Sequence, residues 1–120
     1  MADNVAGQTA SQSSDQLTTG SSQGKVVYDA TAIVAADSTR VQVGFKPRYV
    51  RWENATDRVM IEWFEGMTDN TCIKTAAAGT RTLEAANGGI TVDAQGFRVL
   101  QNATLAAVAA SKTCYWVARA

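Results

Sequence analysis

The chain has 120 residues and a net charge of zero, with 11 Lys and Arg residues against 11 Asp and Glu residues. This length suits a single domain. The basic residues are scattered, so the sequence lacks the positive footprint of a nucleic-acid-binding protein. No apolar run approaches the ~20 residues that a membrane span requires. The N-terminus lacks the basic and apolar regions of a signal peptide, so we expect synthesis and retention in a cytoplasm.

The first 24 residues differ in composition from the rest of the chain. They contain no aromatic residue and only two charged side chains, Asp3 and Asp15, and Ser, Thr, Gln and Gly dominate them. Such a segment buries too little apolar surface to offset the entropy that it loses on ordering. We therefore predict a polar, flexible N-terminal arm over residues 1–24 and a folded domain over residues 25–120.

Short β-branched and alternating segments follow the arm. The predicted strands are residues 25–28, 40–45, 49–53, 58–64, 71–75, 80–83, 90–92, 97–100 and 114–118, with a weaker short candidate at 31–34. The alanine-rich residues 103–112 are interpreted as strand or loop, because the segment is short and lies between strands. Many short strands, frequent turn signals and no convincing helix predict an all-β fold, specifically a small antiparallel β-sandwich of jelly-roll-like type.

The segment RYVRWENATDRVMIEWFEGM, residues 48–67, predicts a β-hairpin with its turn at residues 54–57. The predicted register pairs Trp52 with Val59, Val50 with Ile61, and Glu53 with Arg58. This register places apolar residues opposite apolar ones and a charge opposite a countercharge. Because the turn lacks the Asn-Gly signal of the tightest hairpins, a longer loop with a bulge is the alternative.

The two faces of this hairpin have different predicted roles. The predicted core residues are Val50, Trp52, Val59, Ile61 and Trp63, together with Trp116 from the closing strand. The opposite face mixes aromatic, Met and Arg side chains with carboxylates, a composition typical of interfaces. We predict an oligomer interface there, formed by Tyr49, Arg51, Met60 and Phe64. The alternative is that another strand or loop of the same chain covers this face.

The sequence offers little catalytic chemistry. It contains no histidine, which removes the commonest general base and the commonest transition-metal ligand. Cys72 and Cys114 lack the paired spacing of a zinc site and are predicted to be buried thiols, with a mutual disulfide as the alternative. Glu62 and Glu65 would point to opposite faces of a strand. We therefore expect no enzyme activity, no metal and no cofactor.

Three segments carry a resemblance to a known class of proteins: GFKPRYVRWENATDRVMIEWFEGM, CIKTAAAGTRTLE and ITVDAQGFRVLQNATL. Over roughly residues 25–118 the chain resembles small virion-associated proteins of tailed bacteriophages. Within that class it is most similar to head decoration (cement) proteins. The resemblance implies a small β-sandwich that forms homotrimers on the capsid exterior and stabilises the head by clamping subunits of the major capsid protein. It also implies synthesis in the cytoplasm of a bacterial host, and neither nucleic acid nor membrane as a partner.

Within this hypothesis the N-terminal arm contacts the capsid, and its candidate contact residues are Val5, Gln8, Gln12, Gln16 and Leu17. Three alternatives belong to other classes. One is a tail or fibre-associated module that recognises glycan on the host surface. The second is a small enzyme or inhibitor, and the third is a tail-tube or neck component that forms rings.

Overall fold

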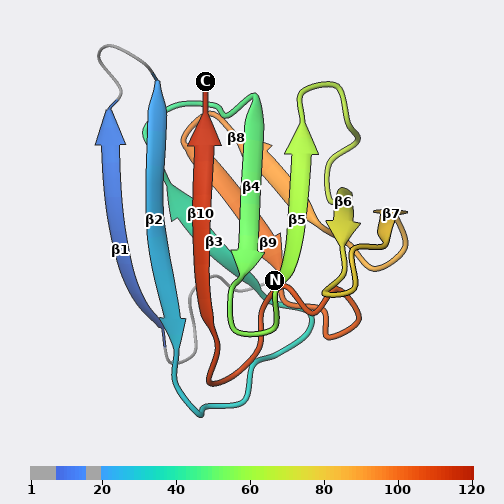
Figure 1. Cartoon of the computed structure of the whole chain (residues 1–120). Coiled ribbons are helices and arrows are strands. Elements are labelled where there is room, and N and C mark those ends of the chain that lie inside the picture. Colours follow the sequence, from blue (N-terminus) through green and yellow to red (C-terminus); the bar gives the residue numbers. More distant parts are fainter. Residues whose placement is uncertain (1–7, 16–19) are drawn as a thin grey trace.

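The computed structural model describes residues 8–15 and 20–120, with side chains described from Gly20 onward. This part of the chain forms ten β-strands and contains no helix (Figure 1). The strands are β1 (Gln8–Asp15), β2 (Ser21–Tyr28), β3 (Ser38–Gln42), β4 (Tyr49–Asn54), β5 (Val59–Phe64), β6 (Cys72–Thr75), β7 (Arg81–Glu84), β8 (Ile90–Asp93), β9 (Gly96–Leu100) and β10 (Thr113–Arg119).

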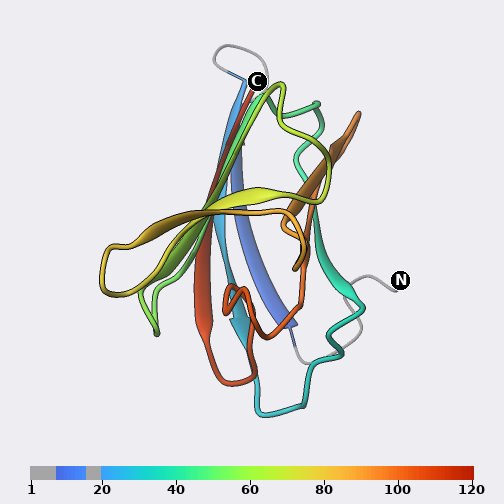
Figure 2. The same ribbon diagram turned by 90° about the vertical axis from the view of Figure 1, so that its right-hand side faces the viewer.

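The strands form two antiparallel sheets. The larger has the order β1-β2-β10-β4-β5-β6-β7, and the smaller has the order β3-β9-β8. The chain leaves the larger sheet after β2 and again after β7, and it returns with β4 and with β10. Figure 2 shows the teal and orange strands of the smaller sheet on one side of the larger one. The predicted all-β antiparallel sandwich is therefore confirmed.

Alternating side chains build the core between the sheets. All six residues predicted to lie in the core are buried. The ring of Phe97 in β9 packs edge-on against Trp52 and Trp116, with centroid distances of 6.4 and 5.6 Å. This cluster joins the middle of the smaller sheet to two neighbouring strands of the larger sheet. Edge-to-face packing of this kind stabilises a core beyond the apolar area that it buries.

The β4–β5 hairpin has the predicted faces but a different register. Trp52 lies opposite Ile61, and Asn54 opposite Val59, so the predicted pairing of Trp52 with Val59 is wrong by two residues. The loop contains residues 55–58 rather than a two-residue tip, and Arg58 closes it in a left-handed conformation with φ of 60°. A shift of two residues leaves every side chain on its face, because the side-chain period of a strand is two.

Residues 101–112 form a loop that covers one end of the core. Leu105, Ala107 and Val108 are buried in it. The indole N–H of Trp52 donates to the carbonyl of Ala107 at 2.9 Å, which satisfies a polar atom inside the core. Residues 31–34, the weak strand candidate, form no strand.

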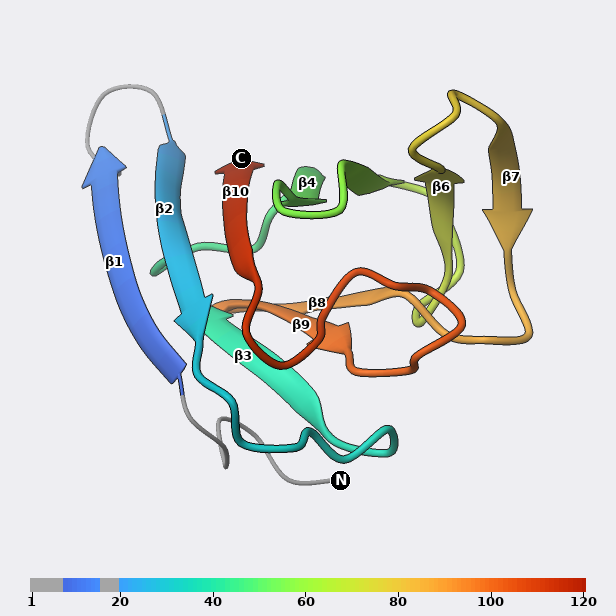
Figure 3. The same ribbon diagram turned by 60° about the horizontal axis from the view of Figure 1, so that its bottom comes forward.

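The N-terminal region contributes strands to one edge of the larger sheet. β2 begins at Ser21, so the predicted boundary between arm and domain falls within this strand. β1 pairs with β2 along its whole length, from Gln8 opposite Tyr28 to Asp15 opposite Ser21 (Figure 3). Of the candidate capsid-contact residues, Gln8 and Gln12 lie in β1, while Val5, Gln16 and Leu17 lie outside the described residues.

Both cysteines are free and completely buried, as predicted. Burial raises the pKa of the Cys72 thiol and of the Cys114 thiol to about 12. Both side chains therefore stay protonated near neutral pH and act as small apolar residues of the core.

Candidate functional site

The side of the larger sheet that faces away from β3, β8 and β9 is the main candidate binding surface. Here it is called the outer face. Its outward side chains include Tyr49, Arg51, Glu53, Met60, Glu62, Phe64, Ile73, Leu83, Tyr115, Val117 and Arg119. Among the described residues, the strands of the smaller sheet cover only the opposite face (Figure 2).

An aromatic pair lies on the outer face where β4 and β5 run side by side. Tyr49 and Phe64 are opposite one another in the register, and their ring centroids are 5.1 Å apart. The guanidinium of Arg119 in β10 lies 6.0 Å from the centre of the Tyr49 ring. The Phe64 side chain remains 42% exposed although it has these neighbours. The pair is therefore an apolar surface held in a fixed arrangement.

A partly buried carboxylate fixes the position of Tyr49. The Tyr49 hydroxyl donates to Oε2 of Glu62 at 2.8 Å. Burial and this hydrogen bond to the Glu62 carboxylate raise the pKa of Tyr49 to about 12. The other oxygen of Glu62 accepts from Arg81 in β7 at 3.1 Å. Glu62 thereby connects an aromatic side chain in β4 to the edge of the sheet.

Several charges on and beside the outer face are paired within the chain. Arg51 donates to Glu53 on the same strand at 2.8 Å, and Arg48 donates to Glu65 beside the face at 2.9 Å. These side chains are substantially exposed, so the pairs add little to stability. Their neutralised charges lower the cost of bringing another protein surface against the aromatic side chains. Mixed aromatic, Met and Arg surfaces of this type are common at protein interfaces.

A shallow hollow of about 210 Å³ lies beside the exposed Tyr115 ring. Its lining residues are Arg51, Glu53, Tyr115, Trp116 and Val117. The Tyr115 side chain is 50% exposed, whereas Trp116 is buried beneath it. The hollow therefore combines an accessible aromatic ring with a charged pair that can donate and accept hydrogen bonds.

The structure brings together the four residues predicted as an oligomer interface. Tyr49 and Arg51 lie on β4, while Met60 and Phe64 lie on the neighbouring β5, all on the outer face. Their role in an oligomer remains a prediction. The sequence interpretation did not assign Tyr115, Glu62 or Arg119 to the site. Alternation about the core residue Trp116 was the signal that could have placed Tyr115 on the same surface.

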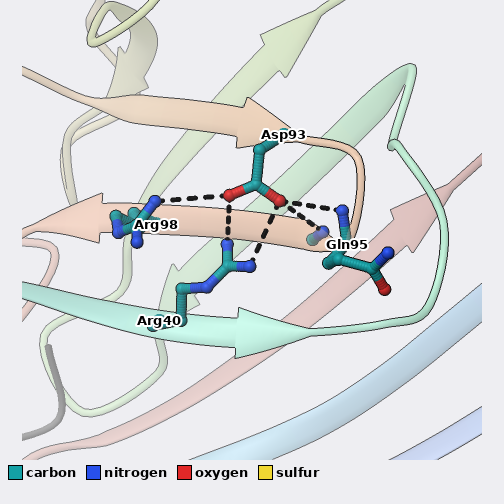
Figure 4. Close-up of polar contacts among 5 residues, drawn as sticks. Arg40, Asp93, Gln95 and Arg98 are labelled. Carbon is teal, nitrogen blue, oxygen red and sulfur yellow. Dashed lines mark hydrogen bonds and ion pairs between the residues drawn. The ribbon is translucent and has the colours of Figure 1, made fainter.

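A second polar cluster lies on the outer side of the smaller sheet. Arg40 of β3 binds both oxygens of Asp93, at 2.5 and 3.2 Å, and Arg98 of β9 approaches one of them at 3.3 Å (Figure 4). The backbone N–H groups of Gln95 and Gly96 donate to Asp93 at 2.8 and 3.0 Å. Burial alone would raise the pKa of Asp93, but the Gln95 N–H and the Arg40 guanidinium together lower it. The cluster ties the β8–β9 turn to β3.

A hollow of about 260 Å³ lies next to this cluster. Its lining residues are Ser38, Asn70, Gly89, Thr91, Arg98 and Leu100. No group of three or more His, Cys, Asp or Glu side chains that could hold a metal ion occurs within the described ranges.

Comparisons with protein-family models, with curated proteins and with solved structures found no match to this chain. Within residues 8–15 and 20–120, no helix has the length and hydrophobicity that a membrane span requires.

Proposed function

We propose that this protein is a capsid decoration (cement) protein of a tailed bacteriophage, which binds the outer surface of the head as an oligomer and stabilises it without catalysis. The observation that carries the proposal is the outer face. It presents the Tyr49–Phe64 pair, with Phe64 42% exposed, near two ion pairs formed within the chain, Arg51–Glu53 and Arg81–Glu62. The resemblance of residues 25–118 to small virion proteins supports the same role and a location on the capsid exterior.

The mechanism is mechanical. Three copies associate through their outer faces, and each copy contacts the major capsid protein through its N-terminal segment. Each contact is weak, but contacts made at several points on one lattice act together and gain strength through their high effective concentration. Internal pressure must then break many contacts at once to separate neighbouring capsid subunits.

Capsid binding is tested by sedimenting the full-length protein with empty heads assembled from the major capsid protein of the same phage. Val5 and Leu17 are, apart from Met1, the only large apolar residues among the first 24. Burying an aliphatic side chain contributes about 1.5 kcal/mol or more, so we expect the double substitution Val5→Asp and Leu17→Asp to weaken binding at least about tenfold.

The matched control for this experiment is Thr82→Asp, at an exposed position on the opposite edge of the larger sheet. This variant should bind heads as the unchanged protein does. Failure of the unchanged protein to sediment with heads would overturn the proposed function. If the double variant Val5→Asp and Leu17→Asp bound heads as well as the unchanged protein, the arm would not be part of the capsid contact.

The hollow beside Tyr115 favours a second candidate function, recognition of host-surface glycan by a tail or fibre-associated module. An exposed aromatic ring next to polar groups that fix orientation is a common arrangement in small-ligand sites. Titration with oligosaccharides from bacterial capsules and lipopolysaccharide separates the two functions. Saturable binding that Tyr115→Ala abolishes and Leu83→Ala preserves would favour glycan recognition, whereas no binding would favour the decoration role.

A further inference from the structure

The edge strand β1 has an unusual composition for a strand of a β-sandwich. Its sequence is QTASQSSD, without a single large apolar residue, yet it pairs with β2 over all eight of its positions. Backbone hydrogen bonds must therefore supply most of the attraction between the two strands. Strands whose residues are polar on both sides specify their partner and register only weakly, and they are prone to domain swapping.

The other side of β2 is held independently of β1. β2 pairs with β10 from Ser21 opposite Arg119 to Val27 opposite Thr113. Ser22, Val26 and Tyr28 are buried from the same strand. The domain therefore keeps β2 in place through its core and through β10, whichever strand occupies the other edge of β2.

Gly20, directly before β2, contacts the residue that follows β10. The N–H of Ala120 donates to the carbonyl of Gly20 at 2.7 Å. Gly20 has φ of 60°, and a Cβ atom at this position would lie 2.6 Å from the Cβ of Ala120. The C-terminal residue thus holds the chain at the start of β2, and only glycine fits there. In the larger sheet β1 is an edge strand and pairs with β2.

A β2 edge without a partner would leave a row of backbone N–H and C=O groups unpaired, which is a template for pairing with another chain. The β1 strand of a second copy carries the same groups as the β1 strand of the first. Exchange between copies therefore replaces each backbone hydrogen bond with an identical one. Exchange of an identical element is a route to oligomers of low energetic cost.

We propose that the edge of β2 is a docking site for β1 of a second copy of this chain, so that neighbouring copies exchange their N-terminal strands. The inference rests on the proposed function, because the oligomer brings the copies together and raises their effective concentration. The edge of β2 would be a second contact surface between copies, separate from the outer face. Copies would then be connected by main-chain pairing at the sheet edge as well as by aromatic contacts on the outer face.

Disulfide trapping between two variants, each with one added cysteine, tests the exchange. Ser13 and Gln23 are opposite one another in the β1–β2 register, and Gln23 is exposed. Opposite positions in antiparallel strands are close enough for a disulfide after small adjustments. Full-length Ser13→Cys and Gln23→Cys chains are co-expressed, purified and oxidised, while the native Cys72 and Cys114 remain buried.

With complete strand exchange and random mixing of the two variants, about half of the chains should move to the dimer position on a non-reducing gel, and each dimer should contain one chain of each variant. Co-expression of Ser13→Cys with Thr82→Cys, on the far edge strand β7, is the matched control and should leave most chains monomeric. A mixed-dimer yield no higher than this control would overturn the proposal. A double variant Ser13→Cys/Gln23→Cys that closes within single chains would overturn it too.

The outcome is separable from a failure of the proposed function. If each β1 strand stays on its own copy, the oligomer can still form through the outer face and sediment with heads. If the protein is not a decoration protein, head sedimentation fails whichever disulfides form.

Discussion

The indole ring of Trp52 connects the two sheets at the centre of the core. It is fully buried, contacts Phe97 edge-on and donates a hydrogen bond to the carbonyl of Ala107. Truncation would remove the aromatic contact, leave a cavity and take away one of two donors to the Ala107 carbonyl, which also accepts from the Cys114 thiol. We expect Trp52→Ala to lower the free energy of unfolding by about 3–5 kcal/mol, as measured by urea denaturation.

Tyr115→Ala is the control for this substitution, because its ring is half exposed. It should change the free energy of unfolding by less than about 1 kcal/mol. A loss below about 1 kcal/mol for Trp52→Ala would show that the ring does not lie in a packed core.

Asp93 gives the stability of the smaller sheet a dependence on pH. Its folded-state pKa is lowered below the ordinary value of 3.8, so its contribution is present above that value and is lost as the pH falls through the folded pKa. We expect Asp93→Asn to have a lower urea midpoint than the unchanged protein between about pH 5 and 7, and the difference to narrow below about pH 4. A difference that stays constant down to pH 2 would contradict the proposed role of the Asp93 carboxylate.

Residue alternation allowed the buried side of individual strands to be predicted from the sequence. All six predicted core residues are buried, and the four predicted interface residues share the outer face. The Arg40–Asp93–Arg98 cluster could not be predicted in this way. Its members come from three different strands, and sequence spacing does not reveal which strands are neighbours.

At the scale of elements, the β4–β5 hairpin shows the limit of pattern reasoning. The predicted and observed registers differ by two residues, and both place apolar residues opposite apolar ones. The length of the loop decides between them, and that length depends on Arg58 adopting a left-handed conformation. Nothing in the alternation of side chains distinguishes the two registers, because both preserve the faces.

Gly96 determines how closely β9 approaches β3. A Cβ atom at Gly96 would lie 2.0 Å from the carbonyl oxygen of Val41, so the strands could not keep their present separation. We expect Gly96→Ala to lower the free energy of unfolding by about 1–3 kcal/mol or more, as measured by thermal or urea denaturation. Gln95→Ala, at the exposed neighbouring turn position, should have little effect. Equal stability of both variants would show that the backbone of β3 moves freely at this contact.

At the scale of the whole molecule, β10 is the strand that completes the larger sheet. In the larger sheet β10 lies between β2 and β4. Along the sequence, β2 and β4 are separated by β3, which belongs to the smaller sheet. The sequence predicted this closing strand but not its neighbours, because strand order follows from long-range packing rather than from local pattern. The same packing places Tyr115 and Arg119 of β10 opposite Glu53 and Tyr49 of β4, and so it assembles the outer face from distant segments.

The central claim is that the outer face mediates self-association, and its most direct test is the mass of the purified full-length protein in solution by light scattering. We expect three chain masses for the unchanged protein. We expect one chain mass for Phe64→Ser, whose half-exposed position preserves the fold, with circular dichroism as the check on folding. A single chain mass for the unchanged protein, or an unchanged trimer in the Phe64→Ser variant, would contradict the claim.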